Sequence, residues 1–336
     1  MEDSIGRAQM IDPTPNRYTL LADIGGTNTR VALAEGNRLL PETISRYANA
    51  GRPALEPILT DYMESTGVRD LAGACVAVAG PVAVDGQTAS MTNLDWTIGT
   101  GPIARATRAE QVFILNDLQA QGYALGALPE GATRQIVTGQ AAPHGASQLV
   151  IGIGTGFNAA PVHEAPGGRL VAASECGHAS LPILDETDIA LMRFVEGAHG
   201  FPGVEDVLSG RGLERVHAFV TREAGRPIQC GAAEIMGQME AGTPDAIRTG
   251  ALFVRMMGMV VGDLALIHLP FGGIYLCGGV ARALTPYLER FGFETALCSK
   301  GRFSDFMRAF PVAVIEDDYA ALTGCAAFLS ARLRAQ

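Results

Sequence analysis

Several patterns that would indicate a function directly are missing from this chain of 336 residues. Its six cysteines are widely scattered and none stands in a CxxC pair, which disfavours a structural zinc site and a disulfide framework. No GxxxxGK[ST] segment occurs, so a P-loop is excluded. Residues 1–17 lack the apolar core of a signal peptide, and we interpret them as a flexible leader. We therefore predict reduced thiols and a cytoplasmic location.

The chain has fewer basic than acidic residues and no uninterrupted apolar run long enough to cross a membrane. Lys and Arg number 25 against 35 Asp and Glu, giving a net charge of −10 at pH 7. Because a phosphate backbone selects a basic surface, a nucleic-acid partner is disfavoured, whereas a small phosphorylated ligand needs only local donors. The longest apolar stretch, Met256–Ala281, is broken by Asp263, His268 and Pro270. It predicts a buried helix running into a buried strand and no membrane span.

What the chain does contain is enough apolar sequence for a large core. Hydrophobic residues make up 48% and charged residues 18%, and the length suggests about two domains. Strand-like and helix-like segments alternate, which predicts an α/β fold. The expected strands are Tyr18–Ile24, Asn28–Ala34, Leu71–Ala79, Gln111–Leu115 and Val312–Ile315, and the expected helices are Leu55–Ser65, Leu118–Leu125 and Tyr319–Leu333, with a helix-rich region over Glu186–His268.

The segment Leu20–Arg30 joins two apolar runs through Gly25 and Gly26, which predicts a β-hairpin. The turn offers backbone N–H groups and the hydroxyls of Thr27 and Thr29 to a phosphate. The carboxylate of Asp23, near the end of the first run, can help to hold Mg²⁺ beside them. A purely structural glycine turn is the equal alternative.

A partial echo of this segment occurs at Leu149–Ala159, where Gly154 can be laid on Gly25 and Gly152 on Asp23. The echo suggests two halves built from a related unit, each presenting a glycine turn. The second copy lacks the acid, so any metal role belongs to the first. The same segment satisfies the loose GxGxx[GA] pattern of dinucleotide-binding enzymes, although Pro161 follows where a helix would run.

Asp117 follows a short apolar strand and the amide Asn116, and it precedes a predicted helix. A carboxylate at the C-terminal end of such a strand faces the crevice where α/β proteins bind ligands. The alternative is that Asp117 caps the helix, which is a common use of Asp at this place.

Three further segments are ambiguous in isolation. Glu175 and His178 stand three residues apart and can point at one polyhydroxylated ligand, or can lie on a solvated loop. Glu205 reads alone as an ordinary surface acid. Gly278 and Gly279 follow an apolar strand, where they permit close approach by a ligand or by a packed helix.

Taken in order, these segments resemble the bacterial glucokinases of the non-ROK type, within the sugar kinase/Hsp70/actin superfamily. The resemblance spans roughly residues 18–333. Its motifs are Asp23-Ile-Gly-Gly-Thr-Asn and Gly152-Ile-Gly-Thr-Gly156 for phosphate, Met91-Thr-Asn-Leu-Asp-Trp96, the catalytic Leu115-Asn-Asp117, the sugar loop Glu175-x-Gly-His178, Glu205-Asp-Val-Leu-Ser-Gly, the adenosine motif Gly272–Gly279, and Lys300-Gly-Arg-Phe303.

The resemblance implies ATP-dependent phosphorylation of the 6-hydroxyl of glucose, the first step of glycolysis, with Asp117 as general base. It implies that the sugar is held by Asn116, Asp117, Glu175, His178 and Glu205. It implies that the nucleotide is held by Asp23, Gly25, Gly26, Thr27, Asn28, Gly154, Thr155, Gly156, Gly278 and Gly279, with Asp23 binding Mg²⁺ through water.

The resemblance also implies a two-domain, actin-like ATPase (ribonuclease H-like) α/β fold, with mixed sheets flanked by helices and a cleft between the domains. We place the small domain at residues 18–118 plus 319–336 and the large domain at 119–318. A homodimer is expected, and the zinc cluster of ROK-type relatives is absent.

Two positions depart from the family pattern. Phe157-Asn158 stands where the family continues its second phosphate loop with Leu-Gly, and Cys176 replaces a glycine of the sugar loop. Either change can shift the sugar preference. The alternatives to a glucokinase are therefore a kinase for another hexose and a catalytically weak sugar-binding or regulatory homologue. An NAD-dependent enzyme is a minor third interpretation.

Overall fold

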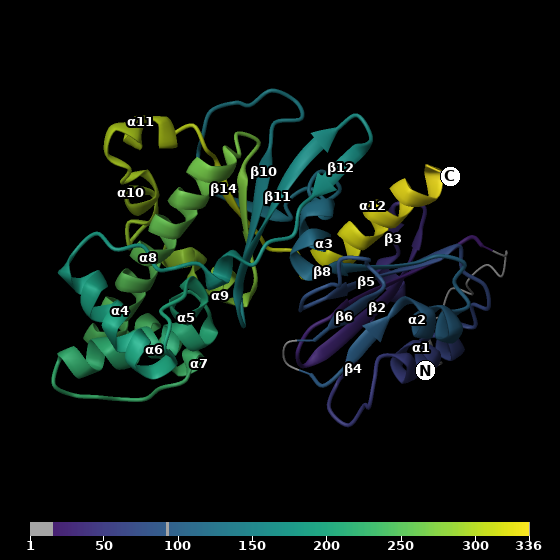
Figure 1. The fold of residues 1–336 in the computed structure, drawn as a ribbon, viewed down its shortest axis with the longest axis horizontal. Helices are drawn as coiled ribbons and strands as arrows, with labels where there is room; N and C mark the ends of the chain where they lie inside the picture. The colour runs from purple at the N-terminus through teal and green to yellow at the C-terminus, as the bar shows by residue number, and fades with distance from the viewer. Residues whose placement is uncertain (1–15, 92–93, 336) are drawn as a thin grey trace, which may run out of the picture. The chain divides into compact units, whose positions relative to one another are not determined.

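The computed structural model describes residues 16–91 and 94–335 (Figure 1). Almost all of the predicted leader at 1–17, and Thr92 and Asn93 of the Met91–Trp96 motif, lie outside the described residues. The chain forms two compact units, the first running to Leu128 and resuming at Tyr319, and the second spanning Pro129–Asp318. The predicted boundary after residue 118 was therefore ten residues too early, because the helix that it interrupts packs within the first unit.

The first unit is built on a mixed sheet with strand order β3-β2-β1-β5-β8, and β4 pairs with β2. The hairpin strands β1 and β2 are antiparallel, while β1, β5 and β8 run parallel to one another. The strands are β1 (Thr19–Ile24), β2 (Asn28–Glu35), β3 (Arg38–Leu39), β4 (Ser45–Ala48), β5 (Gly73–Val78) and β8 (Val112–Asn116), with a separate pair β6 (Thr88–Ser90) and β7 (Thr97–Gly99).

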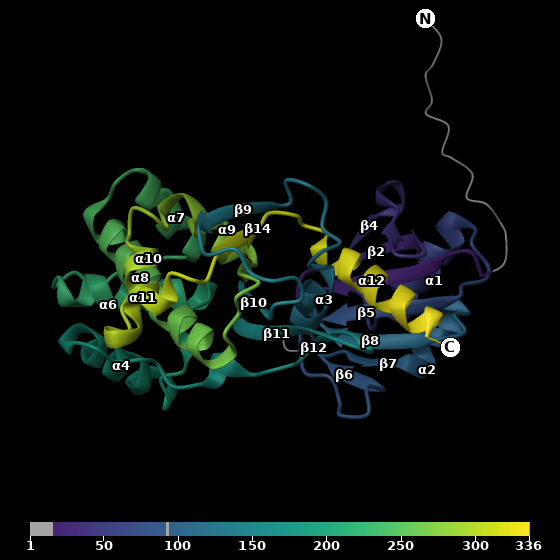
Figure 2. The ribbon, with the colours of Figure 1, turned by 90° about the horizontal axis from the view of Figure 1, so that it is seen from above.

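Helices cover the two faces of this sheet, as expected where a central strand such as β5 is buried along its whole length. One face packs against α1 (Glu56–Thr66) and α2 (Thr100–Thr107), and the other against α12 (Ala320–Arg334). The last of these lies beside α3 (Asp117–Ala124), as Figures 1 and 2 show. A Cβ on Gly324 of α12 would lie only 1.7 Å from the carbonyl oxygen of Ala120, so the two helices touch backbone to backbone.

The second unit repeats the arrangement with strand order β12-β11-β10-β13-β14-β9. Here β10 and β11 form the antiparallel hairpin, and β10, β13 and β14 run parallel. The strands are β9 (Thr133–Val137), β10 (Gln148–Ile153), β11 (Phe157–Ala165), β12 (Gly168–Val171), β13 (Ile274–Cys277) and β14 (Val312–Ile315). The order β3-β2-β1-β5-β8 thus corresponds strand by strand to β12-β11-β10-β13-β14, as the sequence echo suggested.

The larger core of the second unit is helical and centres on α8 (Pro244–His268). By length and composition alone α8 could cross a membrane, but 67% of its most apolar window is buried, and core helices pass the same test. The other helices are α4 (Glu186–His199), α5 (Val204–Val207), α6 (Gly210–Glu223), α7 (Ala232–Glu240), α9 (Gly279–Leu284), α10 (Phe293–Cys298) and α11 (Ser304–Met307). Single 3₁₀ turns lie at η1 (Pro41–Thr43), η2 (Cys176–His178), η3 (Thr285–Tyr287) and η4 (Gly301–Phe303).

The close contact between α3 and α12 leads to a first prediction. We expect Gly324→Ala to lower the free energy of unfolding by about 1–3 kcal/mol, because the added methyl forces the two helices apart. Gly237→Ala in α7 is the matched control, since a Cβ there meets no atom within 4 Å. Its effect is expected to be stabilising, by about 0.5–1 kcal/mol. Urea denaturation measures both; equal effects would contradict the assigned contact.

Candidate functional site

The predicted site residues of the first unit gather at one edge of its sheet. Because β1, β5 and β8 are parallel, their C-terminal ends align, and Ile24 pairs with Val78, which pairs with Asn116. The glycine turn after β1 and the start of α3 after β8 therefore flank the same edge. They stand two strand spacings apart, or about 9–10 Å.

The first glycine turn is held by hydrogen bonds that the sequence did not reveal. Gly25 N donates to Asn28 O at 3.0 Å, which closes the turn. Asn49, only 2% exposed, donates from Nδ2 to Gly25 O at 2.8 Å and accepts at Oδ1 from the Thr29 hydroxyl at 2.8 Å. The expectation that Thr29 offers its hydroxyl to phosphate was therefore wrong. The exposed Thr27 keeps that possibility.

Asp23 is paired within its own hairpin. Its Oδ2 accepts from Arg30 Nη1 at 3.2 Å, and 16% of its side chain is exposed. Burial raises the pKa of the Asp23 carboxyl, and the Arg30 guanidinium offsets part of that rise. A single carboxylate fits an ion that keeps most of its waters, as Mg²⁺ does. In the part of the chain that the structure describes, no cluster of three or more His, Cys, Asp or Glu could form a dedicated metal cage.

The structure resolves the ambiguity at the start of α3. Asn116 is the N-cap: its Oδ1 accepts from Leu118 N at 3.0 Å, and its own N–H donates to Gln119 Oε1 at 3.1 Å. Asn116 Nδ2 also donates to Gly80 O at 3.2 Å. Asp117 is instead the first residue of the helix, and Leu118 N donates to its Oδ1 at 2.9 Å. The alternative that Asp117 caps the helix was therefore wrong, because the preceding amide does so.

The second glycine turn lies at the corresponding edge of the second sheet. Gly154 N donates to Gly156 O at 2.9 Å, and Gly154 O accepts from Gly210 N at the start of α6 at 2.8 Å. Gly278, which follows the parallel strand β13, has φ of +95°, and a Cβ there would lie 2.4 Å from Ile153 O. Gly278 is thus a packing glycine, whereas a Cβ on Gly279 would meet nothing within 4 Å.

Glu205 is tied directly to this second turn. Its Oε2 accepts from Phe157 N at 2.9 Å, and a Cβ on Gly156 would lie 2.4 Å from the same oxygen. A Cβ on Gly177 would lie 2.0 Å from Phe157 O and 3.4 Å from Glu205 Cβ. The glycine turn, the loop Glu175–His178 and α5 therefore meet through close contacts at Gly156 and Gly177. The interpretation of Glu205 as an ordinary surface acid was wrong, since its carboxylate is half-buried in this cluster.

Glu175 and His178 lie at the two ends of the 3₁₀ turn η2. His178 N donates to Glu175 O at 3.1 Å, and residues three apart in a 3₁₀ turn project on the same side. Both side chains are exposed. The structure thus brings Glu175, His178 and Glu205 together beside Gly154–Gly156, within the second unit.

The two departures from the family pattern face one another. The Asn158 amide bonds to Ser174, Glu175 and Cys176, so its side chain engages the sugar loop. The half-buried Cys176 packs toward the core, and burial raises the pKa of its thiol. The dinucleotide pattern at Gly154–Ala159 was misleading, because the glycine turn leads into strand β11 and no helix begins there.

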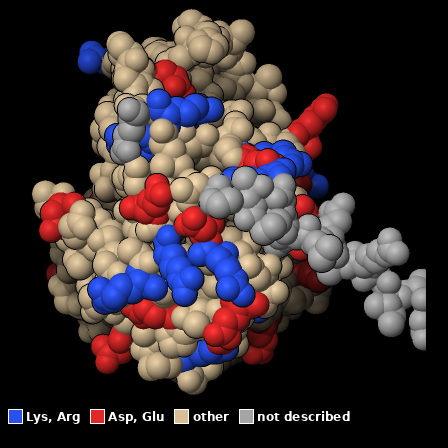
Figure 3. Space-filling view, turned by 90° about the vertical axis from the view of Figure 1, so that its right-hand side faces the viewer, with Lys and Arg blue, Asp and Glu red and all other residues tan. Residues whose placement is uncertain are grey.

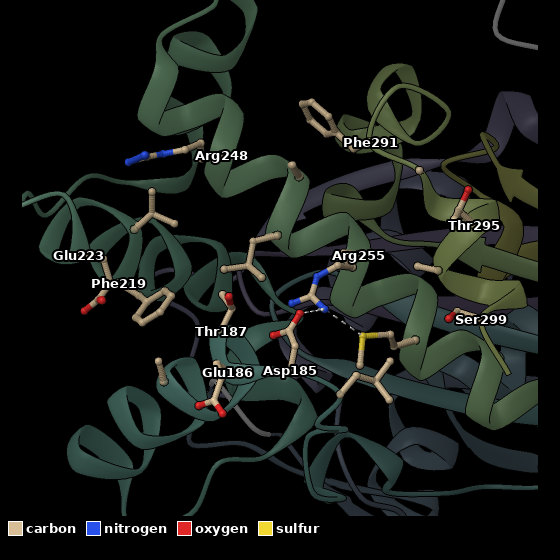
Figure 4. A pocket seen from close by; sticks show the side chains of 18 of the residues that line it. Asp185, Glu186, Thr187, Phe219, Glu223, Arg248, Arg255, Phe291, Thr295 and Ser299 are labelled. Carbon is tan, nitrogen blue, oxygen red and sulfur yellow. Dashed lines mark hydrogen bonds and ion pairs between the residues drawn. The ribbon is translucent and has the colours of Figure 1, made fainter. Parts of the chain in front are cut away.

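A cavity of about 1150 Å³ in the second unit lies elsewhere and contains none of the predicted site residues (Figure 4). It is lined by α4, α6, α8 and α10, and Arg255 of α8 points across it to Asp185 at 3.3 Å. Lys300, from the last motif, donates to Met259 O at 3.0 Å and to Asp263 at 2.5 Å. The geometry therefore gives Lys300 a structural role, tying η4 to α8.

Comparison with known proteins bears on the whole chain. The family model described as Glucokinase matches residues 20–332. The chain belongs to the glucokinase family. The glucokinase of Caulobacter vibrioides is 34% identical over 324 residues, covering 94% of this chain and 96% of the relative. That of Cupriavidus metallidurans is 33% identical, covering 97% of each.

Solved glucokinase structures share the fold. A glucokinase from an Antarctic psychrotroph superposes with a TM-score of 0.81 at 29% identity, covering 93% of this chain and 98% of that one. The Balamuthia mandrillaris glucokinase, solved in complex with glucose, superposes with a TM-score of 0.78 at 20% identity, covering 94% of each chain. At this identity the similarity indicates a shared fold only. The two-domain α/β kinase fold predicted from the sequence is confirmed.

The close contact between Gly156 and the Glu205 carboxylate leads to a second prediction for this chain, which uses the sugar-binding role that the family resemblance implies for Glu205. We expect Gly156→Ala to weaken glucose binding about tenfold, because the new methyl expels the Glu205 carboxylate from its bond with Phe157 N. Gly197→Ala is the control, since a Cβ there meets nothing within 4 Å. Isothermal titration with glucose measures both variants, and unchanged affinity in Gly156→Ala would contradict the role given to Glu205.

Proposed function

We propose that this chain transfers the γ-phosphoryl group of ATP to the 6-hydroxyl of glucose. The observation that carries the proposal is membership of the glucokinase family over residues 20–332. Supporting it, a ROK-family glucokinase of Streptomyces griseus with the same fold was solved in complex with glucose and AMPPNP. The net charge of −10, with acidic and basic side chains interspersed on the face in Figure 3, suits small-molecule substrates better than a nucleic acid.

In this proposal Asp117 takes the proton from the attacking hydroxyl. The Asn116 cap fixes the start of α3, so the carboxylate is presented on rigid backbone at the edge of the sheet. Asn116, Glu175, His178 and Glu205 pair the other sugar hydroxyls. A site that pairs each hydroxyl rejects an analogue lacking one, because the protein's polar group is then left unsatisfied.

Phosphoryl transfer asks the protein mainly for positioning and charge neutralisation. We assign the nucleotide phosphates to Gly25, Gly26, Thr27 and Asn28 in the first unit, and to Gly154, Thr155 and Gly156 in the second. We assign the adenosine of the nucleotide to Gly278 and Gly279, at the end of the adenosine motif. Mg²⁺ bound to the phosphates would neutralise their charge, and Asp23 would hold it through a water. The open position of Gly279 and the exposed hydroxyls of Thr27 and Thr155 suit this assignment.

A cytoplasmic location and a homodimeric state complete the proposal. A kinase that uses ATP needs the compartment that supplies it. The six cysteines are scattered through the sequence without a CxxC pair, which supports a reducing compartment. Light scattering at several protein concentrations tests the oligomeric state.

The third prediction tests the base. We expect Asp117→Asn to lower kcat about 10²–10⁴-fold, because an amide can hold the hydroxyl but cannot take its proton. The dissociation constant for glucose should change less than about tenfold, since one hydrogen bond survives. A coupled assay over glucose, mannose and glucosamine with Mg-ATP measures the first quantity, and calorimetry the second.

The control for this variant is Asp305→Asn, which makes the same chemical change at an exposed site in α11. Its kcat should match that of the unmodified chain. Full activity in Asp117→Asn would contradict the base assignment. Absence of phosphorylation of every hexose by the unmodified chain would favour the alternative of a catalytically weak sugar-binding homologue.

The fourth prediction concerns Asp23 and separates metal use from folding. We expect Asp23→Asn to weaken the use of Mg-ATP while glucose binding is retained. At neutral pH the variant should also be at least as stable as the parent, because burial makes ionised Asp23 costly and an amide carries no charge. The measurements are KM for Mg-ATP, glucose calorimetry and urea denaturation.

The sign of the pH dependence follows from the raised pKa. The unfolded chain ionises this carboxyl near pH ~3.9, and the folded chain does so at higher pH. Folding stability is therefore lost as the pH rises through that interval. The stability advantage of Asp23→Asn should shrink toward zero as the pH falls to about 4. A variant that is less stable than its parent at neutral pH would instead indicate a structural ion pair with Arg30.

A further inference from the structure

The side-chain amide of Asn158 is engaged by hydrogen bonds at both its oxygen and its nitrogen. Its Oδ1 accepts from Ser174 Oγ at 3.1 Å, from Cys176 N at 3.2 Å and from Ala159 N at 2.8 Å. Its Nδ2 donates to Ser174 O and, at 3.2 Å, to Glu175 Oε2. Donors thus face the amide oxygen, and acceptors face the amide nitrogen. The network fixes the orientation of the amide, since a flipped group would oppose donor to donor.

Asn158 lies opposite Gly152 in the β10–β11 hairpin, at the position that corresponds to Arg30 in the first unit. It pairs with Gly152 one step before the hairpin closes, just as Arg30 pairs with Asp23 in the first unit. In the first unit the two partners bind each other across the strands. In the second, Gly152 has no side chain to bind, and the Asn158 amide reaches out of the hairpin to the loop that carries Glu175.

This contact restricts what Glu175 can offer to a ligand. The side chain of Glu175 is exposed, and an exposed glutamate would otherwise sample several rotamers. With Oε2 engaged by Asn158, the carboxylate is oriented, and its other oxygen is left to a sugar hydroxyl. The loop backbone on both sides of Glu175 is held by the same amide, through Ser174 O and Cys176 N.

We propose that Asn158 is a positioning residue that orients the Glu175 carboxylate toward the sugar and thereby sets the selectivity among hexoses. This role rests on the proposed function, in which Glu175 binds the sugar. Asn158 itself need not touch the substrate. Asn158 determines which carboxylate oxygen of Glu175 faces the sugar and the direction in which it points. Epimers of glucose differ in the direction of one hydroxyl, so the orientation of this oxygen affects which epimer is bound.

The first test removes the amide. In Asn158→Ala we expect KM for glucose to rise about tenfold, as for the loss of one hydrogen bond to a charged group, with KM for ATP unchanged. The ratio of kcat/KM for glucose to that for mannose should fall toward one. Asn37→Asp, a change on an exposed turn, controls for surface charge in the series. Unchanged KM and an unchanged ratio in Asn158→Ala would overturn the role.

The second test uses an isosteric variant with a pH signature. Asn158→Asp keeps the acceptor that faces Ser174 Oγ and Cys176 N, but at neutral pH it sets a carboxylate oxygen against both Glu175 Oε2 and the carbonyl oxygen of Ser174. Two adjacent carboxylates cannot both ionise freely, so one gains a proton as the pH falls. A protonated Asp at this position can again donate to Glu175. The ratio of kcat/KM for glucose between variant and parent should therefore recover as the pH is lowered to about 5.

Other titratable groups near position 158 must be considered in that comparison. On the elements packed against β11 they are Cys176 and His178 of η2, Glu205 and Asp206 of α5, and Arg169 of β12. Arg169 pairs with Glu164, and Asp206 with Arg215. These groups are the same in parent and variant, so taking the ratio at each pH cancels their effect. A deficit in Asn158→Asp that does not change with pH would overturn the proposal.

The outcomes separate the two levels of inference. An unmodified chain that phosphorylates no hexose would remove the proposed function and this role with it. An active chain whose Asn158 variants show the parent's selectivity would overturn only the role of Asn158. Thermal melting with and without glucose identifies a variant that fails to fold, and Asn158→Asp, the closer isostere, then decides.

Discussion

The site residues are positioned by a constraint that both units share. In each unit, the first strand of an antiparallel hairpin also pairs in parallel with a strand from later in the chain. In the first unit β1 pairs with β5, and in the second β10 pairs with β13. The glycine turn of the hairpin must then lie at the edge where the parallel strands end. Residues distant in sequence, such as Gly25 and Asp117, or Gly154 and Gly279, reach one edge without any loop having to be long.

Close contacts at three glycines crowd the edge of the second sheet. At Gly156 and Gly177 a side chain would collide with Glu205 or with Phe157 O, and at Gly278 with Ile153 O. Such contacts leave little room for the loops to move independently. A site that must recognise a sugar by the directions of its hydroxyls benefits from this rigidity, because misplacement by an ångström is enough to blur the choice between epimers.

The sequence predicted local structure well and side-chain partners poorly. The apolar runs around β1, β5, β8 and α12 were predicted within one or two residues, because burial imposes a pattern that is local in sequence. Thr29 was misassigned because its partner Asn49 is 20 residues away. The isolated interpretation of Glu205 as a surface acid failed for the same reason, since its carboxylate meets a turn 48 residues earlier, and only the family resemblance placed Glu205 in the predicted site. The hydrophobic periodicity of a sequence carries no information about side-chain partners that lie this far apart in the chain.

The boundary between the two units also depends on a contact between residues that are distant in sequence. A strand followed by Asn116 and Asp117 correctly indicated a helix, but that helix belongs to the first unit because it packs against α12, about two hundred residues later, and against β5 and β8. A lone glycine in an apolar helix, Gly324 of α12, was the available signal, and it fits a close helix contact.

The two hairpins therefore share a backbone plan and differ in how they use one pair of positions. In the first, a carboxylate and a guanidinium face each other across the strands, and the guanidinium of Arg30 offsets part of the rise that burial causes in the pKa of Asp23. In the second, a glycine and an amide stand in their place, and the amide orients a carboxylate on a neighbouring loop. Under the proposed function, the charged pair serves the hydrated cation and the amide serves the sugar. Under that proposal, two hairpins of the same plan supply different chemistry because the residues at one pair of facing positions differ.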